Sequence, residues 1–269
     1  MIPTIITTCK GRLAFLKQTL PAMVATALPI TVVDYDCPQG TAGFVTTNFP
    51  NVNVVRITDR PLFNHAEARN LGAGRAATDV LAFVDADVML SPGVGEFVRQ
   101  NDFMTDVYFI GDGSLDATVV GVCIVARKHF ARIGGYDECM AGWGYEDIDL
   151  YVRLRASGLE RRFLPHDVIA PIAHANDLRV AFAEEKDQEA SHRLNRLYSR
   201  IKIDMEGIVR RNLSVTERQR IRTLVEDAIT TLIAKSKGAV VPLSIPLSEE
   251  RFGGVARFTR SLTYSLTLA

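Results

Sequence analysis

Short apolar runs alternate with amphipathic segments along the first third of this 269-residue chain. Residues 3–8, 30–33, 52–57 and 80–84 are predicted to be strands, and residues 12–26 and 64–77 helices. Alternation of this kind produces an α/β fold in which helices cover both faces of a mostly parallel sheet. Such sheets bind ligands beyond the carboxyl ends of their strands, so the residues that follow each strand are the first candidates for a functional site.

The composition excludes several classes of protein. Thirty-one basic and 31 acidic side chains give no net charge, which disfavours a dedicated nucleic-acid binder. The four cysteines form no C-x-x-C pair and are far apart in sequence, so we expect ordinary reduced thiols. The opening MIPTII lacks the basic leader of a signal peptide, and no apolar stretch approaches the ~20 residues of a membrane span. We therefore expect a cytoplasmic protein.

The rest of the chain is less regular. We predict a strand at residues 118–126, a helical turn at 129–133 and a helix at 146–157 that ends near Gly158. From about residue 176 to 237 the pattern is mainly helical, and a tail containing Pro, Gly and Ser follows.

Two carboxylates follow the predicted strand at 80–84. Asp85 and Asp87 are spaced i, i+2, which would place both on one side of an extended chain. Converging carboxylates at the end of a strand suit a hard divalent cation, which can in turn hold a diphosphate. The same D-x-D pattern also occurs by chance in solvated turns.

A second acidic group lies in the segment GWGYEDID at 142–149. Glu146 and Asp147 begin the predicted helix beside Trp143, the only tryptophan of the chain. The carboxylates could simply cap the helix N-terminus. Equally, one of them could be a general base that faces a sugar ring, with the indole as an apolar platform.

Two further motifs are weaker. His174, in PIAHAND at 171–177, is isolated, and an isolated histidine is more often structural than a metal ligand. GAGRAA at 72–77 matches the dinucleotide fingerprint G-x-G-x-x-A. It precedes a strand instead of following one, so we do not interpret it as a phosphate loop.

Taken together and in this order, these elements resemble the GT-A glycosyltransferases, and most closely the β-1,4-galactosyltransferase-like group with its bacterial relatives among the chondroitin-type enzymes. The resemblance covers about residues 1–200. It rests on TTCKGR at 7–12, VVDYD at 32–36, FNHAEARNLG at 63–72, DAD at 85–87, the strand region at 121–135, GWGYEDID at 142–149 and His174.

The resemblance implies a GT-A, Rossmann-like fold and transfer of a sugar from a UDP-sugar to a hydroxyl of a saccharide or glycoconjugate acceptor, with inversion. The implied donor-binding residues are Thr8, Lys10, Arg12, Asp34, Asp36, His65, Arg69, Asp85 and Gly121. The implied acceptor-binding residues are Trp143, Tyr145 and Glu146. Asp147 would be the catalytic base, with Glu146 orienting the acceptor.

The implied metal ligands are Asp85, Asp87 and His174, with Asp85 assigned mainly to the ribose and the outer shell of the metal. Imidazole favours Mn²⁺ over Mg²⁺. The sequence departs from the animal galactosyltransferases at two of these positions. Tyr145 replaces a glycine of their G-G-E-D, and Pro171 stands in place of a methionine metal ligand.

Other functions stay open at this point: a retaining enzyme, a GDP- or TDP-sugar donor, or a non-catalytic nucleotide-sugar-binding protein. A nucleotidyltransferase would need a glycine-rich basic loop after the first strand, which TCKGR at 8–12 matches only weakly.

We predict a glycosyltransferase domain at 1–204, with a nucleotide-sugar part up to about 115 and an acceptor part at 116–204, and a helical extension at 205–269. Residues 193–222 hold nine basic and three acidic side chains, and residues 216–235 have helical apolar spacing. This pattern fits a packed helix with a solvated basic face. It also fits peripheral attachment to the inner face of a membrane, or a homodimer contact.

Overall fold

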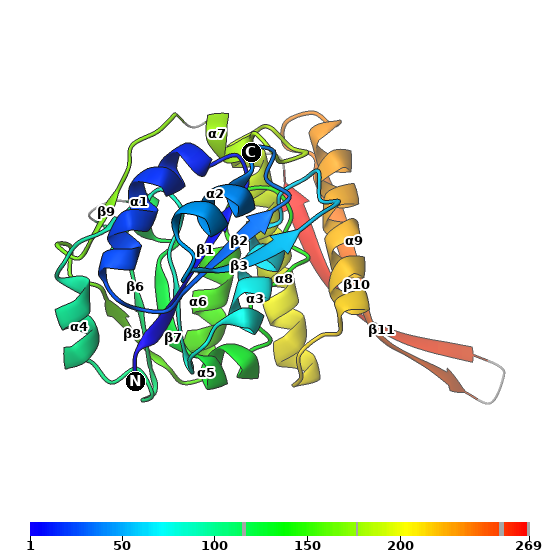
Figure 1. The fold of residues 1–269 in the computed structure, drawn as a ribbon. Helices are drawn as coiled ribbons and strands as arrows, with labels where there is room; N and C mark the ends of the chain where they lie inside the picture. Colours follow the sequence, from blue (N-terminus) through cyan, green and yellow to red (C-terminus); the bar gives the residue numbers. More distant parts are fainter. Residues whose placement is uncertain (115–116, 176, 253–255, 268–269) are drawn as a thin grey trace. The chain divides into compact units, whose positions relative to one another are not determined.

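A seven-stranded sheet forms the centre of the N-terminal part of the chain, in the order β3-β2-β1-β4-β7-β6-β8 (Figure 1). The structure is a computed structural model that describes residues 1–114, 117–175, 177–252 and 256–267. The strands of the sheet are β1 (Pro3–Cys9), β2 (Ile30–Tyr35), β3 (Asn53–Ile57), β4 (Val80–Phe83), β6 (Val107–Ile110), β7 (Cys123–Ala126) and β8 (Glu160–Phe163). Only the pairs that involve β7 are antiparallel. The sheet is therefore mostly parallel, as predicted.

Helices cover both faces of this sheet. They are α1 (Leu13–Ala25), α2 (Thr41–Asn48), α3 (His65–Arg75), α4 (Val94–Gln100), α5 (Arg127–Arg132), α6 (Glu146–Ala156) and the short α7 (Asp177–Val180), with a 3₁₀ turn η1 at Ala117–Val119. Neighbouring residues of β1 point to opposite faces: Ile5 packs in a cluster with α1, α2 and α4, and Ile6 in one with α3, α5 and α6. This alternation follows from the two-residue repeat of a strand.

A small second sheet positions the segment that carries His174. β5 (Val88–Leu90) pairs antiparallel with β9 (Ile169–Pro171), and Val88 lies opposite Pro171. The backbone amide of Ile172 also donates to the Asp87 carbonyl oxygen over 2.7 Å. The chain before His174 is thereby held against the loop that follows β4.

The sequence predicted most of these elements and missed others. The predicted strand at 118–126 is too long, because residues 117–119 form a 3₁₀ turn and only β7 is extended. Gly72 and Gly74 lie inside α3, so the reading against a phosphate loop is confirmed. A Cβ on Gly72 would lie 2.4 Å from Cγ2 of Ile6, so this glycine lets α3 pack closely on the sheet.

The chain divides into two compact units, Met1–Gln188 and Glu189–Ala269. The boundary predicted at 204/205 falls inside α8 (Gln188–Val209). The second unit also contains α9 (Val215–Ile233) and the antiparallel strands β10 (Val240–Phe252) and β11 (Ala256–Thr267). The extension is therefore not wholly helical: the predicted tail is a long hairpin.

The apolar stripe predicted for residues 216–235 is covered by protein. Ile221, Val225 and Ala228 are buried on α9, against which β10 packs. Several basic side chains of the same region are paired, including Arg211 with Glu217 and Arg222 with Glu226. These contacts fit the simpler reading of a packed helix with a charged surface. Among the described residues, no helix is both long and apolar enough to cross a membrane.

Candidate active site

The two aspartates of the D-x-D motif point to different partners. Residues 86 and 87 form a turn in which the amide of Val88 donates to the Asp85 carbonyl oxygen, 3.0 Å away. The expectation that both carboxylates lie on one side of an extended chain is therefore wrong. The Asp85 carboxylate accepts from Arg69, whereas Asp87 faces Arg12 and His174.

His174 approaches Asp87 in an orientation that fits a bound cation. Its Nδ1 lies 2.9 Å from the Ala175 carbonyl oxygen, which can only accept, so Nδ1 must carry a proton. Nε2 lies 2.8 Å from Oδ2 of Asp87. In the neutral ring Nε2 then presents a lone pair to a carboxylate oxygen, and the two repel unless a proton or a cation lies between them. A carboxylate and an imidazole together suit Mn²⁺.

Asp85 does not complete a three-residue metal site. Across the part of the chain that the structure describes, no group of three or more His, Cys, Asp or Glu side chains could hold one metal ion. Nη1 of Arg12 lies 3.2 Å from Oδ2 of Asp87, on the oxygen that also faces His174. Asp87 and His174 are thus two side chains that fit a cation, and the guanidinium of Arg12 adds a positive charge beside Asp87.

Arg69, predicted to bind the donor, lies among three carboxylates. Its side chain is 4% exposed, and its guanidinium nitrogens lie 2.8 Å from Asp85, 3.0 Å from Glu146 and 3.0 Å from Asp147. The ring of Tyr136 lies beneath the guanidinium, 5.1 Å from ring centroid to Cζ. Arg69 therefore connects the loop after β4 with the start of α6, two segments that the sequence analysis treated separately.

One guanidinium cannot neutralise three carboxylates, of which Glu146 is buried and Asp85 and Asp147 are half-buried. Burial raises the pKa of Asp147 well above its usual range, and the nearby Glu146 and Asp85 raise it further, although Arg69 opposes them. Burial also acts to raise the pKa of Asp85, but Arg69 outweighs it, so the net change is a lowering. Of Asp85 and Asp147, Asp147 is therefore the one that takes up a proton more readily, as a catalytic base must.

The start of α6 depends on a strained residue. Tyr145 is the N-cap, with φ of 76°, in the left-handed region that glycine adopts most easily. The animal galactosyltransferases that the sequence resembles have a glycine at this position. Tyr145 therefore holds a backbone conformation that a glycine would adopt more easily, and it leads directly into Glu146 and Asp147.

Gly121 makes room for the cluster around Arg69. A Cβ at this position would lie 2.3 Å from Oδ2 of Asp85 and 3.3 Å from a guanidinium nitrogen of Arg69. Gly121 was predicted to bind the donor. The geometry shows that Gly121 also has a steric role, because any side chain here would displace Asp85.

Most of the predicted donor-binding residues cluster at the carboxyl ends of β1 and β2. Thr8 is buried on β1 opposite Val33. The ammonium group of Lys10 donates to the carbonyl oxygens of Tyr35, Asp36 and Arg60 at 2.6–3.3 Å. Lys10 therefore holds the two strand ends together.

Asp34, in β2, and Asp36, just after β2, were both predicted to bind the donor, and they differ in accessibility. Both carboxylate oxygens of Asp34 accept backbone amides, from Cys37 at 2.8 Å and from Ala42 at 2.7 Å. The side chain of Asp36 is 40% exposed and accepts the backbone amide of Arg60. Asp34 orders the loop after β2, and Asp36 is the one that a ligand can reach.

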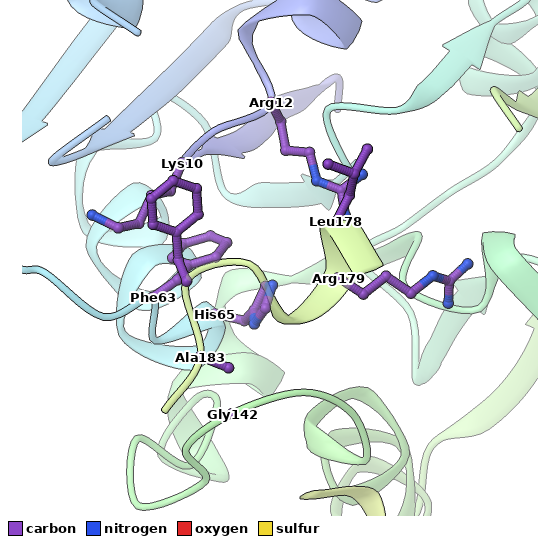
Figure 2. A pocket seen from close by; sticks show the side chains of 9 residues that line it. Lys10, Arg12, Phe63, His65, Gly142, Leu178, Arg179 and Ala183 are labelled. Atoms are coloured by element: carbon purple, nitrogen blue, oxygen red, sulfur yellow. The ribbon is translucent and has the colours of Figure 1, made fainter. Parts of the chain in front are cut away.

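A pocket of about 300 Å³, open to solvent, lies beside these strand ends (Figure 2). It is lined by Lys10, Arg12, Phe63, His65, Gly142, Leu178, Arg179, Phe182 and Ala183. Burial lowers the pKa of His65, which keeps its ring neutral. Its Nδ1 is buried and has no hydrogen-bond partner among the described residues. In Figure 2 the ammonium of Lys10 points away from His65, in agreement with its contacts to the strand ends.

The basic side chains make this pocket suited to an anion. Burial lowers the pKa of Arg12, and the neighbouring Asp87 opposes this change. Arg179, on α7, was not predicted as a site residue, and its guanidinium lies over the ring of Trp143 with Cζ 5.4 Å from the ring centroid. One face of the indole is thus covered by Arg179 and does not face a sugar directly.

Sequence reasoning missed Arg179, Tyr136 and Phe182 as neighbours of the site. Tyr136 and Phe182 contact it through ring faces, beneath Arg69 and beside Lys10. The backbone amide of Phe63 donates to the Phe182 carbonyl oxygen over 2.8 Å, which ties the segment after α7 to the start of α3. Ring contacts between distant segments leave no local pattern that could have revealed them.

Comparison with known proteins agrees with this geometry. Residues 112–176 match a family model described as the N-terminal domain of galactosyltransferase. Among solved structures, similarity extends to GalNAc-T7 with UDP, GalNAc and Mn²⁺, at 12% identity and a TM-score of 0.59 over 90% of this chain and 64% of that one. It also extends to a mannosyltransferase from Pyrobaculum calidifontis in complex with GDP-Man and Mn²⁺, at 14% identity and a TM-score of 0.55 over 87% and 75%. The fold is that of the GT-A glycosyltransferases.

Part of the chain is also similar in sequence to a galactosyltransferase. It is 30% identical to β-1,4-galactosyltransferase 7 of Drosophila melanogaster over 117 residues, 41% of this chain and 36% of that protein. The match therefore spans about a third of the length of that relative. A structure of the Drosophila β-1,4-galactosyltransferase 7 with manganese, UDP-Gal and xylobiose is similar at 20% identity, with a TM-score of 0.50 over 71% of this chain and 79% of that one.

Proposed function

We propose that the protein is a metal-dependent, inverting glycosyltransferase that moves a sugar from a UDP-sugar to a hydroxyl of a saccharide acceptor. The observation that carries this proposal is the Arg69 cluster. It brings Asp147, a half-buried carboxylate with a raised pKa, to the D-x-D loop, beside a basic pocket and the Asp87–His174 pair. The relatives whose structures contain a UDP-sugar or UDP together with Mn²⁺ support the same reading.

Asp87 and His174 would hold a divalent cation, which supplies Lewis-acid stabilisation of the leaving diphosphate when bound. Arg12 and Arg179 would add positive charge around the same phosphates. Asp36 would meet the nucleobase, because its carboxylate is the more exposed of the two at the end of β2. His65, neutral and with an unpaired Nδ1, would offer a hydrogen bond to the donor.

Asp147 would accept the proton of the acceptor hydroxyl as that oxygen attacks the anomeric carbon. Arg69 orients its carboxylate, and Glu146, the neighbouring residue on α6, would orient the acceptor. A base on the face opposite the leaving group leads to a single displacement and hence to inversion. The adjacent acids Glu146 and Asp147 fit this scheme.

A donor screen tests the proposal. A panel of UDP-, GDP- and TDP-sugars is incubated with the protein and Mn²⁺, Mg²⁺ or EDTA, and hydrolysis and thermal stabilisation are measured. We expect a UDP-sugar to give the largest response, with Mn²⁺ exceeding Mg²⁺ and EDTA abolishing it. If no nucleotide sugar is hydrolysed or stabilises the protein with either metal, the proposal is contradicted. The anomeric configuration of the product, read by NMR, tests inversion separately.

A further inference from the structure

Two of the four cysteines, which are far apart in sequence, lie on neighbouring segments of the fold. Cys9 ends β1 and Cys37 follows β2, and these strands pair in parallel with Cys9 opposite Asp34. Cys9 is 0% exposed, and Cys37 is partly exposed. The two side chains lie close enough for each to shift the pKa of the other.

Further donors surround the two sulfur atoms. The backbone amide of Gly11 donates to Sγ of Cys37 over 3.2 Å, and the hydroxyl of Thr41 donates to Sγ of Cys9 over 3.1 Å. The hydrogen bond from Cys9 lowers the pKa of Cys37 to about 5 against the opposing effect of burial, and Thr41 and Gly11 lower it further. The same pairing raises the pKa of Cys9. These shifts favour a thiolate at the accessible Cys37 and a protonated thiol at the buried Cys9.

The charged groups on the two loops are Asp34, Asp36, Lys10 and Arg12. Each is engaged elsewhere: Asp34 with backbone amides, Lys10 with carbonyl oxygens and Asp36, and Arg12 with Asp87. The thiolate therefore depends on hydrogen bonds and not on an adjacent cation. An accessible low-pKa thiolate with a second thiol in contact is the arrangement found at redox-sensitive cysteines.

We propose that Cys37 and Cys9 form an oxidisable thiol pair, with Cys37 as the nucleophile toward peroxides and Cys9 as the resolving thiol. The Cys37 thiolate attacks one peroxide oxygen: an S–O bond forms, the O–O bond breaks, and hydroxide leaves and takes up a proton as water. Cys9 then attacks the sulfur of the sulfenic acid, the S–S bond forms and the hydroxyl leaves with the Cys9 proton as water. Two thiols lose two electrons, and one peroxide becomes two waters. This site does not depend on the proposed transferase activity.

The first test measures alkylation of the native full-length protein by iodoacetamide as a function of pH, with peptide mass spectrometry reporting each cysteine. A short reference peptide with one cysteine, followed in the same way, is the control. We expect Cys37 to reach half of its maximal rate near pH 5. The rate of the reference peptide should still be rising toward the ordinary thiol pKa of about 8.5. Near pH 6, Cys37 should react on the order of 10-fold faster, because its larger thiolate fraction outweighs its lower intrinsic nucleophilicity.

The second test uses hydrogen peroxide and two variants. In the unmodified chain we expect a Cys9–Cys37 linked peptide that a reducing agent reverses. Cys9→Ser should instead accumulate a sulfenic acid at Cys37, trapped by dimedone, and Cys37→Ser should leave Cys9 unreacted while circular dichroism shows an intact fold. A Cys37 pH profile that matches that of the reference peptide, or oxidation of Cys37 in the unmodified chain without the linked peptide, would overturn the proposal.

Discussion

Arg69 is the residue on which the chemistry of the site depends most. It is a single buried positive charge that faces three carboxylates from two different parts of the chain. Breaking a buried ion pair from one side typically costs 3–5 kcal/mol, because a charge is left without compensation. The surplus of carboxylates means that one acid can change without leaving the guanidinium unpaired. Substitutions at the acids therefore report on catalysis more cleanly than substitutions at Arg69.

We expect Asp147→Asn to lower turnover at least about 100-fold, the range in which a general base contributes, while nucleotide binding survives. Arg69 keeps Asp85 and Glu146 as partners, so the fold should persist. Steady-state kinetics and calorimetric titration with UDP measure the two quantities. Asp149→Asn is the matched control on the same helix turn: Asp149 pairs with Arg153 over 2.7 Å, and its loss should reduce thermal stability instead. Near-normal turnover of Asp147→Asn would rule out this base.

The raised pKa of Asp147 predicts how activity depends on pH. A base must be deprotonated, so kcat/KM should fall with decreasing pH at values above the ordinary aspartate pKa of about 4. Glu146 contributes to the raised pKa, so Glu146→Gln should move this acid limb to lower pH. Profiles of kcat/KM against pH for both proteins measure the shift. An acid limb at the same pH in both would show that another group limits the rate.

At the scale of single residues, sequence reasoning found the acids and basic groups but not their pairing. Asp85, Asp147 and Arg69 were all candidates, because each lies in a recognisable motif. The contact between them was out of reach, since α3, the loop after β4 and the start of α6 meet only through the packing of the sheet. The i, i+2 spacing of the D-x-D motif was misleading for the same reason, because a turn directs Asp87 toward His174.

At the scale of elements, the sequence predicted best those features that depend on contacts between residues close together in the chain. The cap of α3 is an example: the side chain of Asn64 accepts the backbone amide of Glu67 over 3.0 Å, as its sequence pattern predicts. Among the described residues, the Glu67 side chain does not return this contact to the Asn64 amide, as it would in a full capping box. The carboxylate of Glu67 bonds the hydroxyl of Tyr35 and pairs with Arg60, and it therefore joins α3 to β2 and the loop after β3. Tertiary contacts redirected a side chain that the local pattern had assigned.

We expect Asn64→Ala to lower the free energy of unfolding by about 1 kcal/mol through loss of this cap. Asn64 also donates to the Glu138 carbonyl oxygen over 2.9 Å, which ties the start of α3 to the loop before α6. Asn64→Asp keeps an acceptor oxygen at the cap and should lose less than Asn64→Ala, and urea unfolding compares the two. Equal losses would show that the contact with Glu138 matters more than the cap.

At the scale of the whole molecule, the alternation of strands and helices predicted the sheet but not its antiparallel member. β7 runs against both of its neighbours, and the sequence of a buried apolar strand does not encode its direction. The C-terminal hairpin was missed because residues 240–246 contain two prolines, which argue against a strand. Both lie in a two-stranded ribbon, where half of the backbone amides need no partner.

The two units predict the outcome of a truncation. A chain that ends at Gln188 should unfold cooperatively and bind UDP, because the sheet and all the proposed site residues lie within Met1–Gln188. A chain that ends at 204, the boundary predicted from sequence, should be less soluble, because it keeps most of α8, with Tyr198 and Ile201, but not α9. Thermal unfolding and size-exclusion chromatography compare the two. A 1–188 chain that is unfolded would show that the first unit depends on the second.

The position of Arg69 also bears on the order in which the chain can fold. The helix that carries it is made early, but two of the three acids that neutralise it, Glu146 and Asp147, lie nearly eighty residues further along. A nascent chain that packs α3 onto β1 and β2 before α6 exists would bury a guanidinium with Asp85 as its one acidic contact from the cluster. We therefore expect the N-terminal strands and α3 to complete their packing only after α6 has been made. The ion pairs between Arg69 and the acids of α6 would then make the folding of this unit cooperative.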